Sequence, residues 1–179
     1  MRTRLLAACL IFRCLLLAQA DHQWVLEQST VTYQVSHPLH HTEGVSHAAK
    51  GKGVCHAGSC DFLIAVPVKS FDSGDSNRDL HMIQVTRGAQ FPMVIVRTRL
   101  PEDASSAATI HADLEIRFAG QTVQYKQVAV QRTTQGTETR ITATIPATLS
   151  NFKIDPPRLL SVPVKNEIPV TVEMTWRPM

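Results

Sequence analysis

The sequence has no motif that marks a common catalytic or nucleotide-binding site. It contains no Gly-x-Ser-x-Gly nucleophile elbow and no glycine-rich loop of the kind that cradles phosphates. The regular alternation of strands and helices that builds a parallel nucleotide-binding sheet is also missing. These absences argue against a hydrolase and against a dinucleotide-dependent enzyme, and we expect a protein that is not an enzyme.

Net charge is absent once the first twenty residues are set apart. The chain of 179 residues has 18 basic and 15 acidic residues. Three of the basic residues (Arg2, Arg4 and Arg13) and none of the acidic ones lie in residues 1–20, so 18 minus 3 leaves 15 residues of each sign. A segment without net charge gives no reason to expect a nucleic-acid partner.

The first twenty residues have the pattern of a secretory signal peptide. A basic start is followed by a mostly apolar run over residues 5–17 and by the small-x-small sequence Ala18-Gln-Ala20. Arg13 interrupts this run, which is shorter than the roughly twenty apolar residues that span a bilayer. We therefore expect residues 1–20 to be removed, with an uncleaved or lipidated form as the alternative. Residues 21–179 should form a single periplasmic or secreted domain with no integral membrane span.

Two cysteines, Cys55 and Cys60, lie beyond the predicted signal peptide. An even pair in an oxidising compartment is most simply a disulfide, here closing a short turn at the tip of a hairpin. The alternative is a metal- or redox-active protein that uses these cysteines with the histidine-rich loop at His37, His40 and His41. The second cysteine pair of a zinc site is missing, and simple strand geometry does not gather these histidines, so we expect no metal site.

Most of the remaining chain alternates between apolar and polar residues, as half-buried β-strands do. The clearest examples are residues 112–118, where charged Asp113, Glu115 and Arg117 separate apolar residues, and residues 168–176, with five apolar residues at a period of two. Some eight such runs with turn residues between them predict an all-β fold, an antiparallel sandwich or barrel.

One stretch departs from this pattern and predicts a short helix at about residues 75–84. Ser76-Asn-Arg-Asp79 has the form of a capping box, and Leu80 and Ile83 follow at helical spacing. Arg87-Gly88 ends the run. One short helix in a β protein commonly covers an open end of the sheet. We expect Arg78, Asp79 and His81 to cap and tether this helix rather than to form a catalytic group.

The inward-facing residues would form either a solid core or a lined tunnel, because an eight-stranded barrel is just wide enough to be filled or to hold one slender apolar ligand. The residue pattern alone does not decide between the two. Our candidate ligand-binding residues are the following apolar and aromatic side chains: Tyr33, Val35, Phe62, Ile64, Met82, Val94, Val96, Leu114, Ile116, Phe118 and Phe152.

Motifs spread in order over residues 24–176 resemble the YceI-like family of exported lipid-binding proteins. They are Trp24-Val-Leu26, residues 29–37, Arg78-Asp79-Leu-His81-Met82, residues 91–96, the hairpin at residues 114–122, and the closing segments at residues 151–154 and 162–172. Glu43-Gly44-Val45 lacks an aromatic residue that the family has there, and the cysteine pair and the histidine-rich loop are not part of its pattern.

This resemblance implies a lipocalin-like antiparallel β-barrel without catalysis. Its ligand would be a long isoprenoid, such as a quinone or a polyprenyl lipid, or another amphiphilic lipid held in an apolar tunnel. No other cofactor is expected, and a homodimer is left open.

Overall fold

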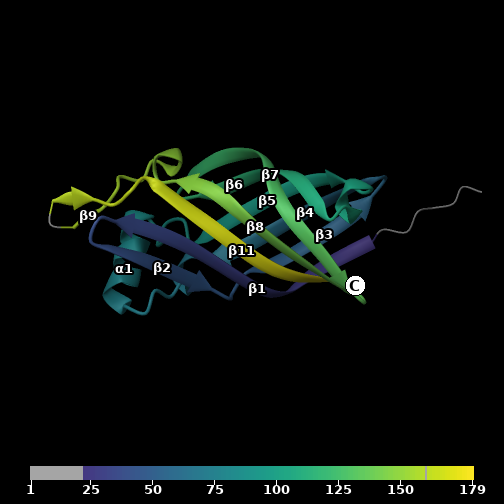
Figure 1. Ribbon diagram of the computed structural model, residues 1–179, viewed down its shortest axis with the longest axis horizontal. Coiled ribbons are helices and arrows are strands. Elements are labelled where there is room, and N and C mark those ends of the chain that lie inside the picture. Colours follow the sequence, from purple (N-terminus) through teal and green to yellow (C-terminus); the bar gives the residue numbers. More distant parts are fainter. Residues whose placement is uncertain (1–21, 160) are drawn as a thin grey trace, which may run out of the picture.

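The computed structural model describes residues 22–159 and 161–179 (Figure 1). The predicted signal peptide, with Cys9 and Cys14, therefore lies outside the described residues, as do the side chains of His40 and Leu159. The strands are β1 (His22–His37), β2 (His40–Ser46), β3 (Lys50–His56), β4 (Ser59–Pro67), β5 (Met93–Pro101), β6 (Thr109–Phe118), β7 (Gln121–Gln135), β8 (Glu138–Thr148), β9 (Arg158–Leu159), β10 (Val162–Pro163) and β11 (Glu167–Pro178). The helices are α1 (Ser76–Val85) and the 3₁₀ turns η1 (Val68–Ser70), η2 (Ala104–Ser106) and η3 (Ser150–Phe152).

The strands close into an antiparallel barrel. The order around it is β11-β8-β7-β6-β5-β4-β3-β1, and pairing of β1 with β11 completes the ring. β2 and β3 lie on the same edge of β1 in one continuous register, with Val31 opposite Ser46 and Val25 opposite Lys52. They therefore act as one long strand interrupted at residues 47–49, and the predicted lipocalin-like barrel of about eight strands is confirmed.

The other edge of β2 has a different neighbour, the segment that leads into α1. Val45 and Asp72 form an isolated antiparallel bridge in which each backbone N–H donates to the other's carbonyl over 2.9 Å. The Ser46 and Ser70 hydroxyls lie 2.6 Å apart beside this bridge. The segment between η1 and α1 therefore covers this edge of β2. Within the described residues, no helix is both long and apolar enough to cross a membrane.

Helix α1 forms within one residue of the predicted bounds, but its N-terminal cap differs from the prediction. The cap is Asp75, whose side chain accepts hydrogen bonds from the backbone N–H groups of Asn77 and Arg78. Asp79 instead accepts from the backbone and the hydroxyl of Ser73. The predicted capping box of Ser76 and Asp79 is therefore wrong, because Asp75 is the residue with extended backbone and it brings a charged acceptor to the positive end of the helix.

The helix ends in a Schellman motif. The Gly88 N–H donates to the Ile83 carbonyl over 2.7 Å and the Arg87 N–H to the Gln84 carbonyl over 3.1 Å. Arg87 has the positive φ of 55° that such an end requires. Its guanidinium donates to the Ala119 carbonyl and lies over the ring of Phe91, which ties the helix to the β6–β7 turn.

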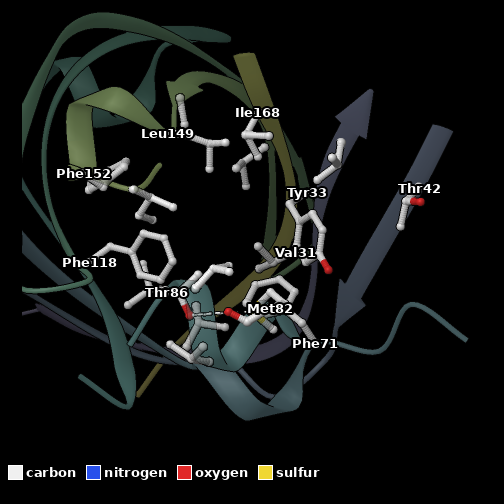
Figure 2. Close-up of a pocket in the computed structure, with 18 of the residues that line it drawn as sticks. Val31, Tyr33, Thr42, Phe71, Met82, Thr86, Phe118, Leu149, Phe152 and Ile168 are labelled. Atoms are coloured by element: carbon white, nitrogen blue, oxygen red, sulfur yellow. Dashed lines mark hydrogen bonds between the residues drawn. The ribbon is translucent and has the colours of Figure 1, made fainter. Parts of the chain in front are cut away.

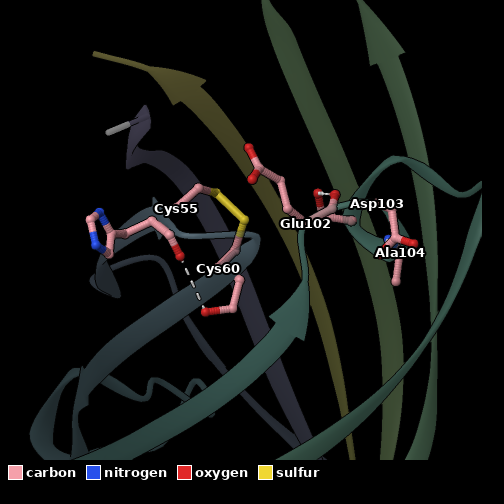
Figure 3. Close-up of a disulfide and its surroundings, with 8 residues drawn as sticks. Cys55, Cys60, Glu102, Asp103 and Ala104 are labelled. Carbon is pink, nitrogen blue, oxygen red and sulfur yellow. Dashed lines mark hydrogen bonds between the residues drawn. A yellow bond between two sulfur atoms is a disulfide. The ribbon is translucent and has the colours of Figure 1, made fainter. Parts of the chain in front are cut away.

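The predicted disulfide between Cys55 and Cys60 is present (Figure 3). The two cysteines are direct partners of β3 and β4, with Cα atoms 3.9 Å apart. Ala57 and Gly58 between them both have positive φ, as a tight two-residue hairpin turn requires. Cys60 is fully buried and Cys55 nearly so, so the disulfide closes the packed end of the barrel. Next to it, Phe62 packs edge-on against Trp176, with ring centroids 5.3 Å apart.

Candidate functional site

An apolar cavity of about 560 Å³ lies inside the other part of the barrel, under α1 (Figure 2). Figure 2 shows side chains from strands, from η3 and from α1 pointing into one common space, with Phe118, Leu149 and Phe152 on one side of it and Val31 and Tyr33 on the other. A cavity of this size is typical of sites for small molecules and cofactors. The interior is therefore not a solid core throughout.

Strand alternation explains why the wall is apolar. On β11, Ile168, Val170, Val172 and Met174 all line the cavity, whereas the intervening Thr171 and Glu173 are exposed. Successive side chains of a strand point to opposite faces, so a period of two places these four apolar residues on the inner face. At the next inward position, Trp176 meets Phe62 and closes the cavity at that end.

Most of the candidate residues lie on the cavity wall. Those in contact with the cavity are Tyr33, Val35, Ile64, Met82, Val94, Val96, Ile116, Phe118 and Phe152. Leu114 faces inward as expected but is packed in the core beyond the cavity, and Phe62 is held against Trp176. These two side chains face the interior but do not line this cavity, because alternation gives the face of a side chain and not how far the space extends along the barrel. That the other nine bind a ligand stays a prediction.

Several wall residues were not among the candidates. Phe71 and Leu149 lie in irregular segments, as do Ile154, Pro157 and Val164, where no periodic pattern identifies an inward side chain. Ile168 and its neighbours on β11 could have been found, because their alternation is plain in the sequence.

The exposed residues of the lining gather at one end of the cavity and mark its mouth. They are Asp75, Asn77, Arg78 and His81 from α1 and its cap, and Arg158 from β9. Figure 1 places α1 and β9 at the same end of the barrel, away from the turn between β3 and β4. The cavity is therefore apolar along its length and polar where it opens.

Arg78 and Asp79 tether the start of α1 through one serine. The Arg78 guanidinium donates to the hydroxyl and to the carbonyl of Ser73, each over 2.9 Å, and Asp79 accepts from the Ser73 N–H over 3.0 Å. The predicted tethering role holds for these two residues. It does not hold for His81, whose side chain makes no such contact in the part of the chain that the structure describes and, like that of Arg78, lines the mouth of the cavity.

Tyr33 is the main polar group of the inner wall. Its ring contacts Phe71, with centroids 5.4 Å apart, and lies over Gly44 on β2. Burial raises the pKa of the Tyr33 phenol, the negative charge of Asp79 raises it further, and Arg78 opposes the shift. The phenol therefore stays protonated at neutral pH and offers an O–H group within a mostly apolar wall.

The histidine-rich loop has separate local contacts. His41 Nδ1 lies 3.1 Å from the Ser36 hydroxyl, His47 Nδ1 lies 3.1 Å from the Ser29 carbonyl, and His37 Nδ1 accepts from the Leu39 N–H over 3.2 Å. Within residues 22–159 and 161–179, leaving aside the side chains of His40 and Leu159, no three His, Cys, Asp or Glu side chains are placed to share a metal ion.

A family model described as a YceI-like domain matches residues 23–176, which is most of the chain. The chain belongs to the YceI-like family. The resemblance found in the sequence is thereby confirmed, and no curated protein matches the chain.

Solved structures with the same fold as this YceI-like chain come from several bacteria. BcnA of Burkholderia cenocepacia aligns with a TM-score of 0.69 and 15% identity, over 82% of this chain and 95% of that one. A polyisoprenoid-binding domain from Saccharophagus degradans, implicated in plant cell wall breakdown, aligns with a TM-score of 0.70 and 12% identity, over 87% and 98%. A YCEI protein of Campylobacter jejuni aligns with a TM-score of 0.51 and 12% identity, over 64% and 70%. At these identities the likeness shows the shared fold.

Proposed function

We propose that this YceI-like protein is an exported binding protein that holds a long-chain isoprenoid or another amphiphilic lipid inside its barrel. The observation that carries the proposal is the cavity, whose walls are built mostly from Val, Ile, Leu, Met and Phe side chains. Each methylene group moved from water onto such a wall is worth roughly 0.8 kcal/mol. A long apolar chain is the kind of molecule that gains most from this wall.

The distribution of polar groups supports an amphiphile rather than a plain hydrocarbon. Arg78, His81 and Arg158 stand at the mouth, while Tyr33 supplies an O–H group on the wall. A ligand with an apolar chain inside and a polar head at the mouth would keep every one of these groups solvated or hydrogen-bonded, which avoids the cost of burying an unpaired polar group.

The relatives and the disulfide are consistent with this proposal. The Saccharophagus degradans domain carries polyisoprenoid binding in its description and has the same fold. The Cys55–Cys60 disulfide fits an oxidising compartment, as does the predicted signal peptide at residues 1–20. The function requires no catalytic step, because storage or carriage of a lipid needs only burial.

Extraction of the purified protein with organic solvent, followed by mass spectrometry, tests the proposal. The protein should be expressed with its signal peptide in a bacterial host and purified without detergent. We expect close to one equivalent of an isoprenoid or similar lipid per chain. An extract without lipid, from a protein that also takes up no isoprenoid added from ethanol, would show that the cavity is not a lipid site.

A further inference from the structure

Two turns stand side by side at the mouth of the cavity. One is the turn between β1 and β2 at Pro38 and Leu39, and the other is the hairpin of β9 and β10 at residues 158–163. The Lys165 N–H donates to the Ser36 carbonyl over 2.8 Å, which joins the base of the second turn to the end of β1. Both turns project from the same end of the barrel in Figure 1. We call these two turns, residues 36–42 together with residues 156–159 and 161–166, the rim.

Apolar side chains of the rim face solvent. Leu39 is 68% exposed and Val162 is 42% exposed. Neither belongs to the buried clusters of the barrel, so neither side chain contributes to the core. A leucine and a valine held in water on neighbouring turns, at the opening of an apolar cavity, form a surface suited to an apolar partner.

The charged side chains within the rim are Arg158 and Lys165. Three exposed acidic residues flank its segments in the sequence, namely Glu43, Asp155 and Glu167. Along the β9–β10 segment the two basic residues lie nearer in sequence to Val162 than these acids do. Further acids near the mouth lie on the α1 side, where Asp75 caps the helix and Asp79 accepts from Ser73.

We propose that the rim docks this protein on a lipid bilayer with anionic headgroups, with Leu39 and Val162 inserted among the lipids and Arg158 and Lys165 against the phosphates. Apolar tips with basic residues behind them are the combination that binds a membrane interface. Because the rim borders the cavity mouth on the side facing α1, a docked protein exchanges a lipid with the bilayer without passing its apolar chain through water. The role of this docking in lipid exchange rests on the proposed lipid-binding function, but the contacts between the rim and the bilayer are tested separately.

Vesicle sedimentation tests the docking. The purified chain is mixed with vesicles of phosphatidylcholine, with or without phosphatidylglycerol, and the bound fraction is measured against lipid concentration. We expect binding only when phosphatidylglycerol is present, and we expect it to weaken as salt is added. Leu39→Glu combined with Val162→Glu should lower the partition coefficient by about tenfold or more. Lys165→Glu should lower it by about fivefold or more, since one basic residue near an anionic surface is worth about that factor.

The matched control is Leu63→Glu. Leu63 is also apolar and 45% exposed, but it lies on β4, outside the rim. It should leave the partition coefficient unchanged. Equal binding by the wild type and the Leu39→Glu/Val162→Glu variant, or an equal loss from Leu63→Glu, would overturn the docking. The dependence of wild-type binding on salt and on phosphatidylglycerol tests the docking without any variant. Binding that changes with neither salt nor phosphatidylglycerol would also overturn the docking.

Retinol, a fluorescent isoprenoid alcohol added from ethanol, separates this inference from the proposed function. A rim variant that binds retinol like the wild type but no longer binds vesicles supports the docking and keeps the lipid site. The wild type could instead bind vesicles through the rim, take up no retinol and yield no extractable lipid. That result would support the docking surface and contradict the proposed lipid-binding function.

Discussion

The ring of Tyr33 on β1 lies directly over Gly44, its partner on β2. A Cβ atom built on Gly44 would lie 2.3 Å from Cε1 of Tyr33, closer than any real contact. The same arrangement recurs at Phe62 over Gly53, where the corresponding distance is 2.4 Å. Glycine is required at these positions for space, since the aromatic ring occupies the place of a side chain, and not for an unusual backbone conformation.

Gly44→Ala should destabilise the protein by about 1–3 kcal/mol, the usual cost of adding atoms to a packed site. The methyl group must displace the Tyr33 ring from Phe71 and from the cavity wall. Urea unfolding of the two proteins measures the effect. In a Tyr33→Ala background the same substitution should cost much less, because the ring is gone. An equal cost in both backgrounds would mean that Tyr33 is not what Gly44 accommodates.

Ile116→Trp should fill part of the cavity and reduce extractable lipid, at a packing cost of about 1–3 kcal/mol. Ile116 is 6% exposed and lies on the cavity wall. The control is Glu115→Gln on the neighbouring, outward position, where the side chain contacts Gln124 and Arg97 at the surface. It should leave lipid content and stability nearly unchanged. Equal lipid loss from both variants would show that the cavity is not where the lipid binds.

Replacement of Cys55 and Cys60 by alanine should cost about 2 kcal/mol of stability, because so short a loop removes little entropy from the unfolded chain. Lipid content should not change, since the disulfide closes the end of the barrel opposite the mouth. Chemical denaturation and solvent extraction of the same double variant check the two statements. Loss of lipid from a variant that still folds would assign the disulfide a role in binding.

Asp113 should make stability depend on pH in the acidic range. The Lys126 ammonium, 2.8 Å away, and the backbone N–H of Gln127 hold the pKa of the Asp113 carboxyl below its ordinary value of 3.8. The carboxyl has a lower pKa folded than unfolded, so its contribution is fully present above the unfolded pKa and disappears as pH falls through the folded pKa. Asp113→Asn should therefore be less stable than the wild type at neutral pH.

Thermal unfolding of the wild type and Asp113→Asn, followed from neutral pH down to about pH 2, should show this difference shrinking below about pH 4. Lys126→Met should weaken the same pH dependence, because the ammonium is the largest cause of the shift, while the hydrogen bonds from Gln127 remain. A difference that stays constant over the whole range would contradict the assignment.

Alternation of apolar and polar residues predicted the barrel because it is a property of each strand by itself. The charged residues at 113, 115 and 117 placed Leu114 and Ile116 on the inner face, where both are buried. Their different depths, Ile116 on the cavity and Leu114 in the core, depend on side chains from other strands, which a single run of sequence does not contain. The cap of α1 likewise could not be predicted from a single run of sequence. Asp75 and Ser76 are both good N-cap residues, and the backbone of the preceding turn selects between them.

The bridge between Val45 and Asp72 is a place where few hydrogen bonds join two parts of the barrel wall. Where β1 meets β11, separation of the wall would break a long ladder, whereas at β2 the bridge contributes two backbone hydrogen bonds. The amide protons of Val45 and Asp72 should accordingly exchange with deuterium through small local fluctuations. The amide protons between β1 and β11 should exchange only when a larger part of the barrel unfolds. The flank beside α1 is thus joined by fewer backbone hydrogen bonds than the seam between β1 and β11, and we expect it to open more readily than that seam.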